Sequence, residues 1–232
     1  MSGRYRLVLF SVLLFFTILM VRIAIPYFSL STDVGFLRIK QWVIENDVWR
    51  FAFFVHVFTS CFLLLAGFTQ FHNPFKQKWR RTHRIAGKSY VLIILTLSGP
   101  AGFVMGLYAN GGLSSQVAFV LLSLLWIYFT AMAYVSIRRK QFVAHGNFMI
   151  RSYALTLSAL TLRAWKVLLV FFFQPHPMDV YMIVAWLGFI PNLIVAEWLI
   201  RKGLPNRIFS PPAGAISQSK APLQSQKNSF RN

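Results

Sequence analysis

The sequence predicts an all-α integral membrane protein, a bundle of six transmembrane helices with both termini cytoplasmic. Three observations lead to this fold class. Hydrophobic residues fill 56% of the 232 positions and charged residues only 12%, about half the charged fraction of a soluble domain. Six apolar stretches each have about the 20 residues that cross a bilayer as a helix. Lys and Arg gather in alternate connections between those stretches.

The predicted spans lie near 7–28, 51–70, 88–108, 115–137, 148–173 and 180–200. The first span follows Arg4 and Arg6 as a signal peptide would. Its apolar run is long, however, and no small-residue cleavage site follows, so we expect a retained anchor. The next stretch, 31–50, contains Trp42 and Trp49 and is expected to rest at the outer membrane surface.

Two later spans contain residues that bend helices or pack them closely. Pro100 in the third span and Pro191 in the last predict kinks. Gly102 and Gly106, four residues apart, are typical of closely packed helices in membranes.

The basic residues predict the orientation of the chain. The second and fourth connections and the segment after the last span are rich in Lys and Arg, whereas the third and fifth connections contain none. The positive-inside rule therefore places both termini in the cytoplasm, with the cell (inner) membrane as the expected location. Because topology already explains the net charge of +19, the expected partner is the lipid bilayer and not nucleic acid.

One transmembrane domain is expected over residues 1–202, with a polar core at 51–173. A basic cytoplasmic tail follows at 203–232, and its Pro, Ser, Gln and Lys content predicts disorder. The sequence contains no Walker loop, no GxGxxG and no CxxC pattern, so we expect neither a nucleotide-driven nor an iron–sulfur mechanism. In the last span, Glu197 is expected to pair with Arg201 four residues later rather than with Arg151 across the bundle.

Polar side chains run along two otherwise apolar spans. In the fifth span, His145, Ser152, Thr156 and Arg163 fall within roughly 20° of one helical line. Such a stripe must face protein, water or a cofactor instead of lipid, so it is a candidate functional site. The second span has a similar polar face, made by His56, Thr59, Ser60, Gly67 and Gln70.

The first candidate site lies in the outer half of the membrane. His56 and Arg163 reach similar depths on spans of opposite direction, with Lys166 one turn above Arg163 and Gln70 on the His56 face. This set predicts a cationic substrate pocket for an anionic ligand or a quinone carbonyl. The alternative is a buried Arg163 neutralised by an external acid, with His56 as its hydrogen-bond partner.

The second candidate site lies at the cytoplasmic side. His83 and Gly87 share one face where the third span begins, and His145 opens the fifth span at the same side. A histidine followed by a bare helical turn suits the binding of b haem, so His83 and His145 are candidate axial ligands of the haem iron and Gly87 a candidate cofactor contact. The alternative is two interfacial histidines among lipid headgroups.

Three segments carry a resemblance to known families: HVFTSCFLLLAGFTQF from His56, THRIAGKSY around His83, and AHGNFMIRSYALTLSALTLR from Ala144 to Arg163. They resemble a family of bacterial multi-pass membrane proteins catalogued only as a domain of unknown function. The resemblance covers roughly half of the chain and implies a shared fold without an established activity.

A weaker similarity is to transmembrane di-haem cytochromes b of the ascorbate-reducing type. Those proteins use four histidines on four consecutive helices as two axial pairs. The equivalents here are His56, His83 and His145, and the fourth span contains no histidine. The similarity therefore implies at most one haem, between His83 and His145.

Three function hypotheses follow. The favoured one is a membrane redox protein that binds one b haem or a quinone, because the two candidate sites lie near opposite faces of the membrane. The second is a small-molecule transporter or binder that uses the outer His56 and Arg163 pocket, with protonation of His56 as a switch. The third is a structural or assembly subunit without a ligand, in which the polar groups satisfy one another.

Overall fold

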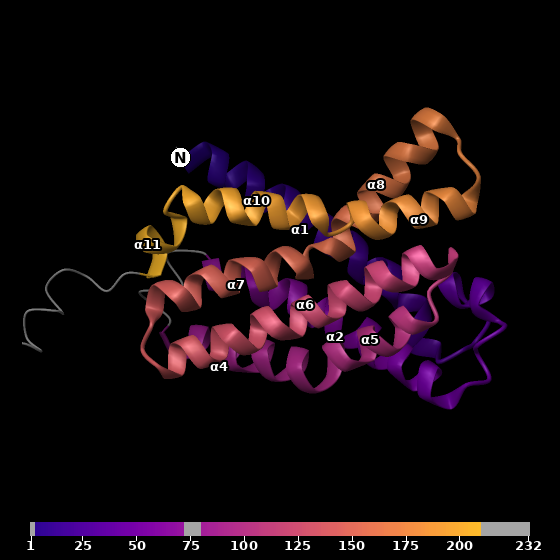
Figure 1. Cartoon of the computed structure of the whole chain (residues 1–232), viewed down its shortest axis with the longest axis horizontal. Helices are drawn as coiled ribbons and strands as arrows, with labels where there is room; N and C mark the ends of the chain where they lie inside the picture. The colour runs from indigo at the N-terminus through magenta and orange to yellow at the C-terminus, as the bar shows by residue number, and fades with distance from the viewer. Residues whose placement is uncertain (1–2, 72–79, 210–232) are drawn as a thin grey trace, which may run out of the picture.

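The computed structural model describes residues 3–71 and 80–209, and every regular element in these two ranges is helical. Five helices are long and apolar enough to cross a membrane, or six if one bent pair counts as a single span. The all-α multi-pass fold is therefore confirmed. Figure 1 shows the long helices aligned along one axis, with the N-terminus and α11 (Leu204–Phe209) at the same end. Most of the predicted tail, 210–232, lies outside the described residues.

The helices form a bundle around α6 (Gly112–Arg138), which packs against α5 (Gly99–Leu107) and α7 (Phe142–Thr156). On the other side, α2 (Asp47–Phe71) packs against α4 (Arg80–Ile93) and α5. The core between them contains several fully buried large side chains, including Leu63, Tyr90 and Ile94. The close-packing prediction for Gly106 is confirmed, since a Cβ there would lie 3.0 Å from the backbone nitrogen of Val120 on α6.

The predicted fifth span is not one straight helix. α7 ends at Thr156, α8 (Ser158–Phe173) starts two residues later, and their axes differ by 41°. The break exposes backbone carbonyls, and Asn192 on α10 (Ile190–Arg201) donates a hydrogen bond of 3.0 Å to the carbonyl oxygen of Ala154. Beyond the bend, α8 rises away from the main bundle, and α9 (Pro177–Leu187) returns along it and packs against α6 (Figure 1).

One end of the bundle, here called the capped end, is covered by the segment between α1 (Gly3–Ala24) and α2. This segment contains two short 3-10 helices, η1 (Ile25–Ser29) and η2 (Gly35–Lys40). It is more than a surface layer, because its Leu37 and Val43 are buried with Trp49 of α2, near the end of α5. The opposite end, here called the basic end, contains the Lys- and Arg-rich connections.

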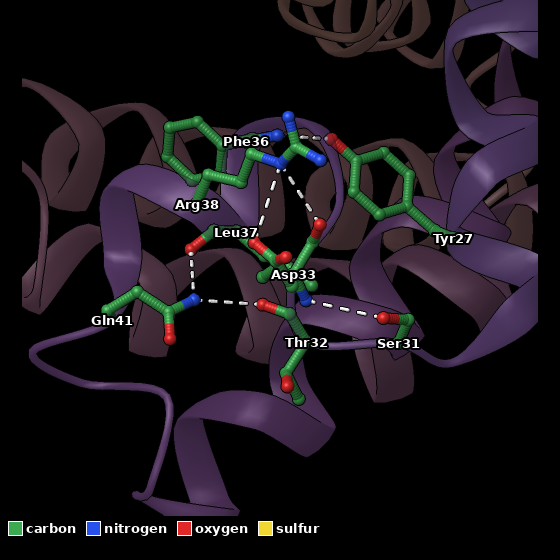
Figure 2. A network of polar contacts seen from close by, with 8 residues as sticks. All are labelled: Tyr27, Ser31, Thr32, Asp33, Phe36, Leu37, Arg38 and Gln41. Atoms are coloured by element: carbon green, nitrogen blue, oxygen red, sulfur yellow. Dashed lines mark hydrogen bonds and ion pairs between the residues drawn. The ribbon is translucent and has the colours of Figure 1, made fainter.

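Polar contacts within the cap fix its path (Figure 2). The Tyr27 hydroxyl accepts a hydrogen bond of 2.8 Å from the backbone N–H of Phe36. Arg38 forms an ion pair of 3.4 Å with Asp33, and the Gln41 amide donates to the carbonyl oxygen of Thr32 at 2.9 Å. These contacts turn the chain back on itself before α2 begins.

Candidate functional site

His56 lies within α2 and is held by the third span, 81–107. Its ring nitrogen Nδ1 lies 2.9 Å from the backbone carbonyl oxygen of Ser98. A carbonyl oxygen only accepts hydrogen bonds, so Nδ1 must carry the proton, and in the neutral ring Nε2 is the basic nitrogen. Within the described residues Nε2 has no hydrogen-bond partner. Gly102 makes room for the ring, because a Cβ there would lie 3.1 Å from Cε1 of His56.

The carbonyl that holds His56 lies at the end of a π-helical segment, η3 (Ile94–Ser98), between α4 and α5. Pro100 follows in the first turn of α5 and has no N–H to give to the preceding turn, so the wider π turn accommodates it. The bend predicted from Pro100 is thus a π segment. Ser98 contacts α2 through a second group as well, because its hydroxyl lies 3.2 Å from the Ser60 hydroxyl.

A cavity of about 60 Å³ lies beside His56, inside the bundle. That volume holds a few water molecules, since one water needs roughly 10–15 Å³. Drug-sized ligands occupy pockets of roughly 300–1,000 Å³, so a ligand of that size does not fit inside. Its polar lining residues come from four helices: His56, Ser60, Ser123, Trp126, Thr156 and Ser158.

Arg163 does not itself line this cavity, but it contacts a residue that does. Its Nη1 donates a hydrogen bond of 2.7 Å to the carbonyl oxygen of Ala159, which also lines the cavity. The guanidinium is close enough to His56 and Cys61 to interact with both electrostatically. Protein surrounds it on most sides, yet the side chain keeps an exposed surface.

No carboxylate lies within ion-pair distance of Arg163 in the part of the chain that the structure describes. Of the acids at the capped end, Asp47 pairs with Arg50, and Glu45 lies on the surface of the cap. Neutralisation by an external acid is therefore not what the structure shows. The positive charge instead remains beside the cavity.

The other predicted substrate contacts do not join the cavity in the same way. Lys166 is exposed on α8, one turn beyond Arg163. Gln70 lies on α2 but fourteen residues from His56, which corresponds to roughly 21 Å along the helix, and its side chain is outside the described part. His56 and Arg163 are thus the pair that the fold brings together.

A second polar cluster lies deeper in the bundle and centres on Tyr90. The buried Tyr90 hydroxyl contacts the hydroxyls of Ser152 at 3.0 Å and Thr156 at 2.7 Å. Trp126 donates to the same Thr156 oxygen at 3.1 Å, and the Thr130 hydroxyl lies 2.7 Å from Ser152. Thr156 also lines the His56 cavity, so the two polar regions share a residue. The polar stripe of the fifth span indicated Ser152 and Thr156, but it did not indicate Tyr90 as their partner.

The candidate haem ligands lie on α4 and α7, which both begin at the basic end (Figure 1). His83 precedes Tyr90 by seven residues and His145 precedes Ser152 by seven, so the Tyr90 contact puts the two histidines at about the same level. Nδ1 of His145 lies 2.9 Å from the carbonyl oxygen of Ala133. Gly87 is half-buried one turn after His83. Haem ligation by this pair stays a prediction.

The pairing predicted for Glu197 is wrong. Its carboxylate forms a bidentate ion pair with Arg151 on α7, with one hydrogen bond of 2.9 Å. The guanidinium also lies near the rings of Phe129 and Phe148, at 5.8 and 5.6 Å from their centroids. A planar guanidinium suits both contacts, which outweigh the local i, i+4 alternative with Arg201. The charge of Arg151 is thus paired across the bundle.

The fold and these sites define the class of the protein, a multi-pass helical membrane protein with polar groups buried inside its bundle. The family described as "Predicted membrane protein (DUF2306)" matches residues 53–200, more than half of the 232-residue chain. The chain belongs to this family. No curated protein and no solved structure matches it.

Proposed function

We propose that this protein resides in the cell (inner) membrane, with its basic end in the cytoplasm, and binds a small ligand through an acceptor oxygen at His56 and Arg163. A quinone carbonyl is the ligand that the site suits best, which makes the protein a membrane redox protein. A small anion is the alternative ligand, which makes it a binder or transporter.

The observation that carries this proposal is the charge of Arg163. Ten residues separate it from the outer end of α8, roughly 15 Å along the helix. An arginine at such a depth costs several kcal/mol unless its charge is compensated, and intramembrane cations therefore tend to mark ligand or ion sites. Within the described residues, the guanidinium uses one hydrogen bond, to its own helix at Ala159, out of the five that it can donate.

His56 adds a group of complementary chemistry. With Nδ1 bound to Ser98, the neutral ring offers Nε2 as an acceptor, and the protonated ring offers it as a second donor. A carbonyl oxygen held between Arg163 and a protonated His56 would receive two donors. A quinol hydroxyl would instead donate to the neutral ring.

Equilibrium binding to the purified protein in mild detergent tests the proposal. A short-chain ubiquinone, menadione and sulfate are titrated separately, so that quinone and anion binding are distinguished. Arg163→Gln removes the charge, and His56→Asn keeps an amide donor for Ser98 while it removes Nε2. We expect each change to weaken binding at least tenfold, whereas Arg22→Gln, an exposed arginine on α1, leaves binding intact. Binding of none of the three ligands, or equal binding by all variants, would contradict the proposal.

A second candidate function is b haem binding by His83 and His145. Their common level favours it, as does the Nδ1 contact of His145 with a backbone carbonyl, an arrangement typical of metal-ligating histidines. When bound, haem would supply one-electron transfer. A pyridine haemochrome assay on protein from haem-replete cells tests it: haem bands lost in His145→Ala support ligation, and a colourless protein rejects it.

A further inference from the structure

We infer that the His56 and Arg163 site opens sideways to the bilayer and takes a lipid-soluble amphiphile, of which only a small oxygen-bearing head enters the cavity. This inference rests on the proposed function and names the class of its ligand. It follows from which sides of the cavity are closed, from the side that is left partly exposed, and from the size of the cavity.

The route from the capped end is closed. On α2, Trp49 and Phe53 lie between the capped end and His56, and they are 0% and 2% exposed. They stack on each other with ring centroids 5.6 Å apart. The cap covers both rings with Leu37 and Val43, so a water-soluble ligand has no direct path along the bundle axis from this end.

The route from the basic end is closed as well. Below the cavity, Leu63 and Leu64 on α2 are 0% and 1% exposed, and Tyr90 is 0% exposed. The Tyr90 hydroxyl is engaged by Ser152 and Thr156 across the bundle. The described core therefore separates the cavity from the cytoplasmic connections.

On the side of the cavity that faces α8, α1 packs on both α2 and α8, but it leaves part of their surfaces exposed. Beyond Leu160 no side chain of α8 is fully buried. The facing part of α2, from Phe54 to Cys61, is only half-buried. Arg163 projects from α8 on this side, and it is both exposed and bound to the cavity-lining Ala159. In a bilayer, a surface at this depth is covered by hydrocarbon chains.

The size of the cavity limits what can enter it. About 60 Å³ accommodates a few non-hydrogen atoms, while the rest of any larger ligand must stay outside, among lipid chains. The head of such a ligand contacts a cation and a histidine, so it carries acceptor oxygens. Its body contacts hydrocarbon, so the ligand as a whole is an amphiphile. A quinone with an isoprenoid tail and a fatty acid share this chemistry.

Cys61 offers a direct test because it is the only cysteine in the chain. It lies next to the cavity-lining Ser60 and is half-buried. A nitroxide attached to Cys61 in liposome-reconstituted protein is exposed to oxygen, which concentrates in hydrocarbon, and to a water-soluble nickel chelate. Two reference labels, both in a Cys61→Ser background, calibrate the scale: Leu168→Cys on the exposed face of α8 and Ser31→Cys on the exposed cap.

We expect the Cys61 label to collide with oxygen as the Leu168→Cys label does, and to be shielded from the nickel chelate. We also expect a short-chain ubiquinone or oleate to reduce oxygen access at Cys61, with no such reduction in Arg163→Gln. Whichever of the two ligands reduces oxygen access identifies the head group that enters the cavity. Access by the nickel chelate, or by neither reagent, would overturn the lateral opening. Ligand binding in detergent would still stand in that case, so the two proposals fail separately.

Discussion

Lys40 makes the stability of the cap depend on pH in the alkaline range. Its side chain is 1% exposed. Its ammonium donates hydrogen bonds to the Tyr108 carbonyl and, at 2.7 Å, to the Asn110 side chain. The ammonium nitrogen lies 5.1 Å from the ring centroid of Trp42 and 5.9 Å from that of Trp49. Burial nevertheless disfavours the charged form and lowers the pKa of Lys40 from 10.5 to about 8. The folded state thus prefers a neutral Lys40 more than the unfolded state does.

The sign and size of the effect follow from proton linkage. Below about pH 8 both states carry the proton, and the folded state bears the full cost of the buried charge. Between about pH 8 and 10.5 the unfolded state binds more protons, so the free energy of unfolding rises with pH. A pKa that falls from 10.5 to about 8 corresponds to at most about 3 kcal/mol over this interval, and solvent screening reduces that figure.

Chemical unfolding in mild detergent between pH 7.5 and 10.5, followed by tryptophan fluorescence, measures the effect. Lys40→Met is the matched control because it keeps the length of the side chain and removes the charge. The difference in unfolding free energy between Lys40→Met and the wild type should be largest near pH 7.5 and should shrink as the pH rises. A difference that does not change with pH would refute the reasoning.

Three further substitutions test the packing of the bundle, each by the free energy of unfolding in detergent. Gly67→Ala should cost about 1–3 kcal/mol, because a Cβ there would overlap the ring of Tyr153, and an unchanged stability would show that the ring moves freely. Tyr90→Phe should cost about 1–3 kcal/mol by leaving buried hydroxyls without their partner; a neutral result would show that water replaces the phenol. Glu197→Gln should cost up to about 1 kcal/mol through the loss of the partly exposed pair with Arg151, and the cost should vanish when Arg151→Gln is already present.

Much of the fold could be predicted from local properties of the sequence. The lengths of the apolar stretches indicated the number of spans, and Gly102 and Gly106 indicated close packing, because both depend on residues near one another in the chain. The bend between α7 and α8 could not be predicted, since the sequence around Leu157 contains no proline or glycine. The Ala154 carbonyl near the bend is bound by Asn192 from another helix, a contact that depends on tertiary packing.

The candidate site could likewise be predicted only in part. Equal depth on spans of opposite direction predicted that His56 and Arg163 meet, and the structure places Arg163 within electrostatic range of His56. The carbonyl of Ser98 that orients His56 could not be predicted, because it lies on another helix, at the end of the π segment before Pro100. For Glu197 the sequence favoured a partner on its own helix, whereas the packing of α10 on α7 brings Arg151 closer.

The most direct measurement of the central claim is the identification of what the protein retains on purification. Organic extracts of wild type, Arg163→Gln, His56→Asn and Arg22→Gln, purified from membranes in the same mild detergent, are compared by mass spectrometry. We predict one lipophilic quinone or fatty acid, near-stoichiometric with the wild type and with Arg22→Gln, and depleted in the other two variants. Extracts that do not differ among the four proteins would contradict a ligand site at His56 and Arg163.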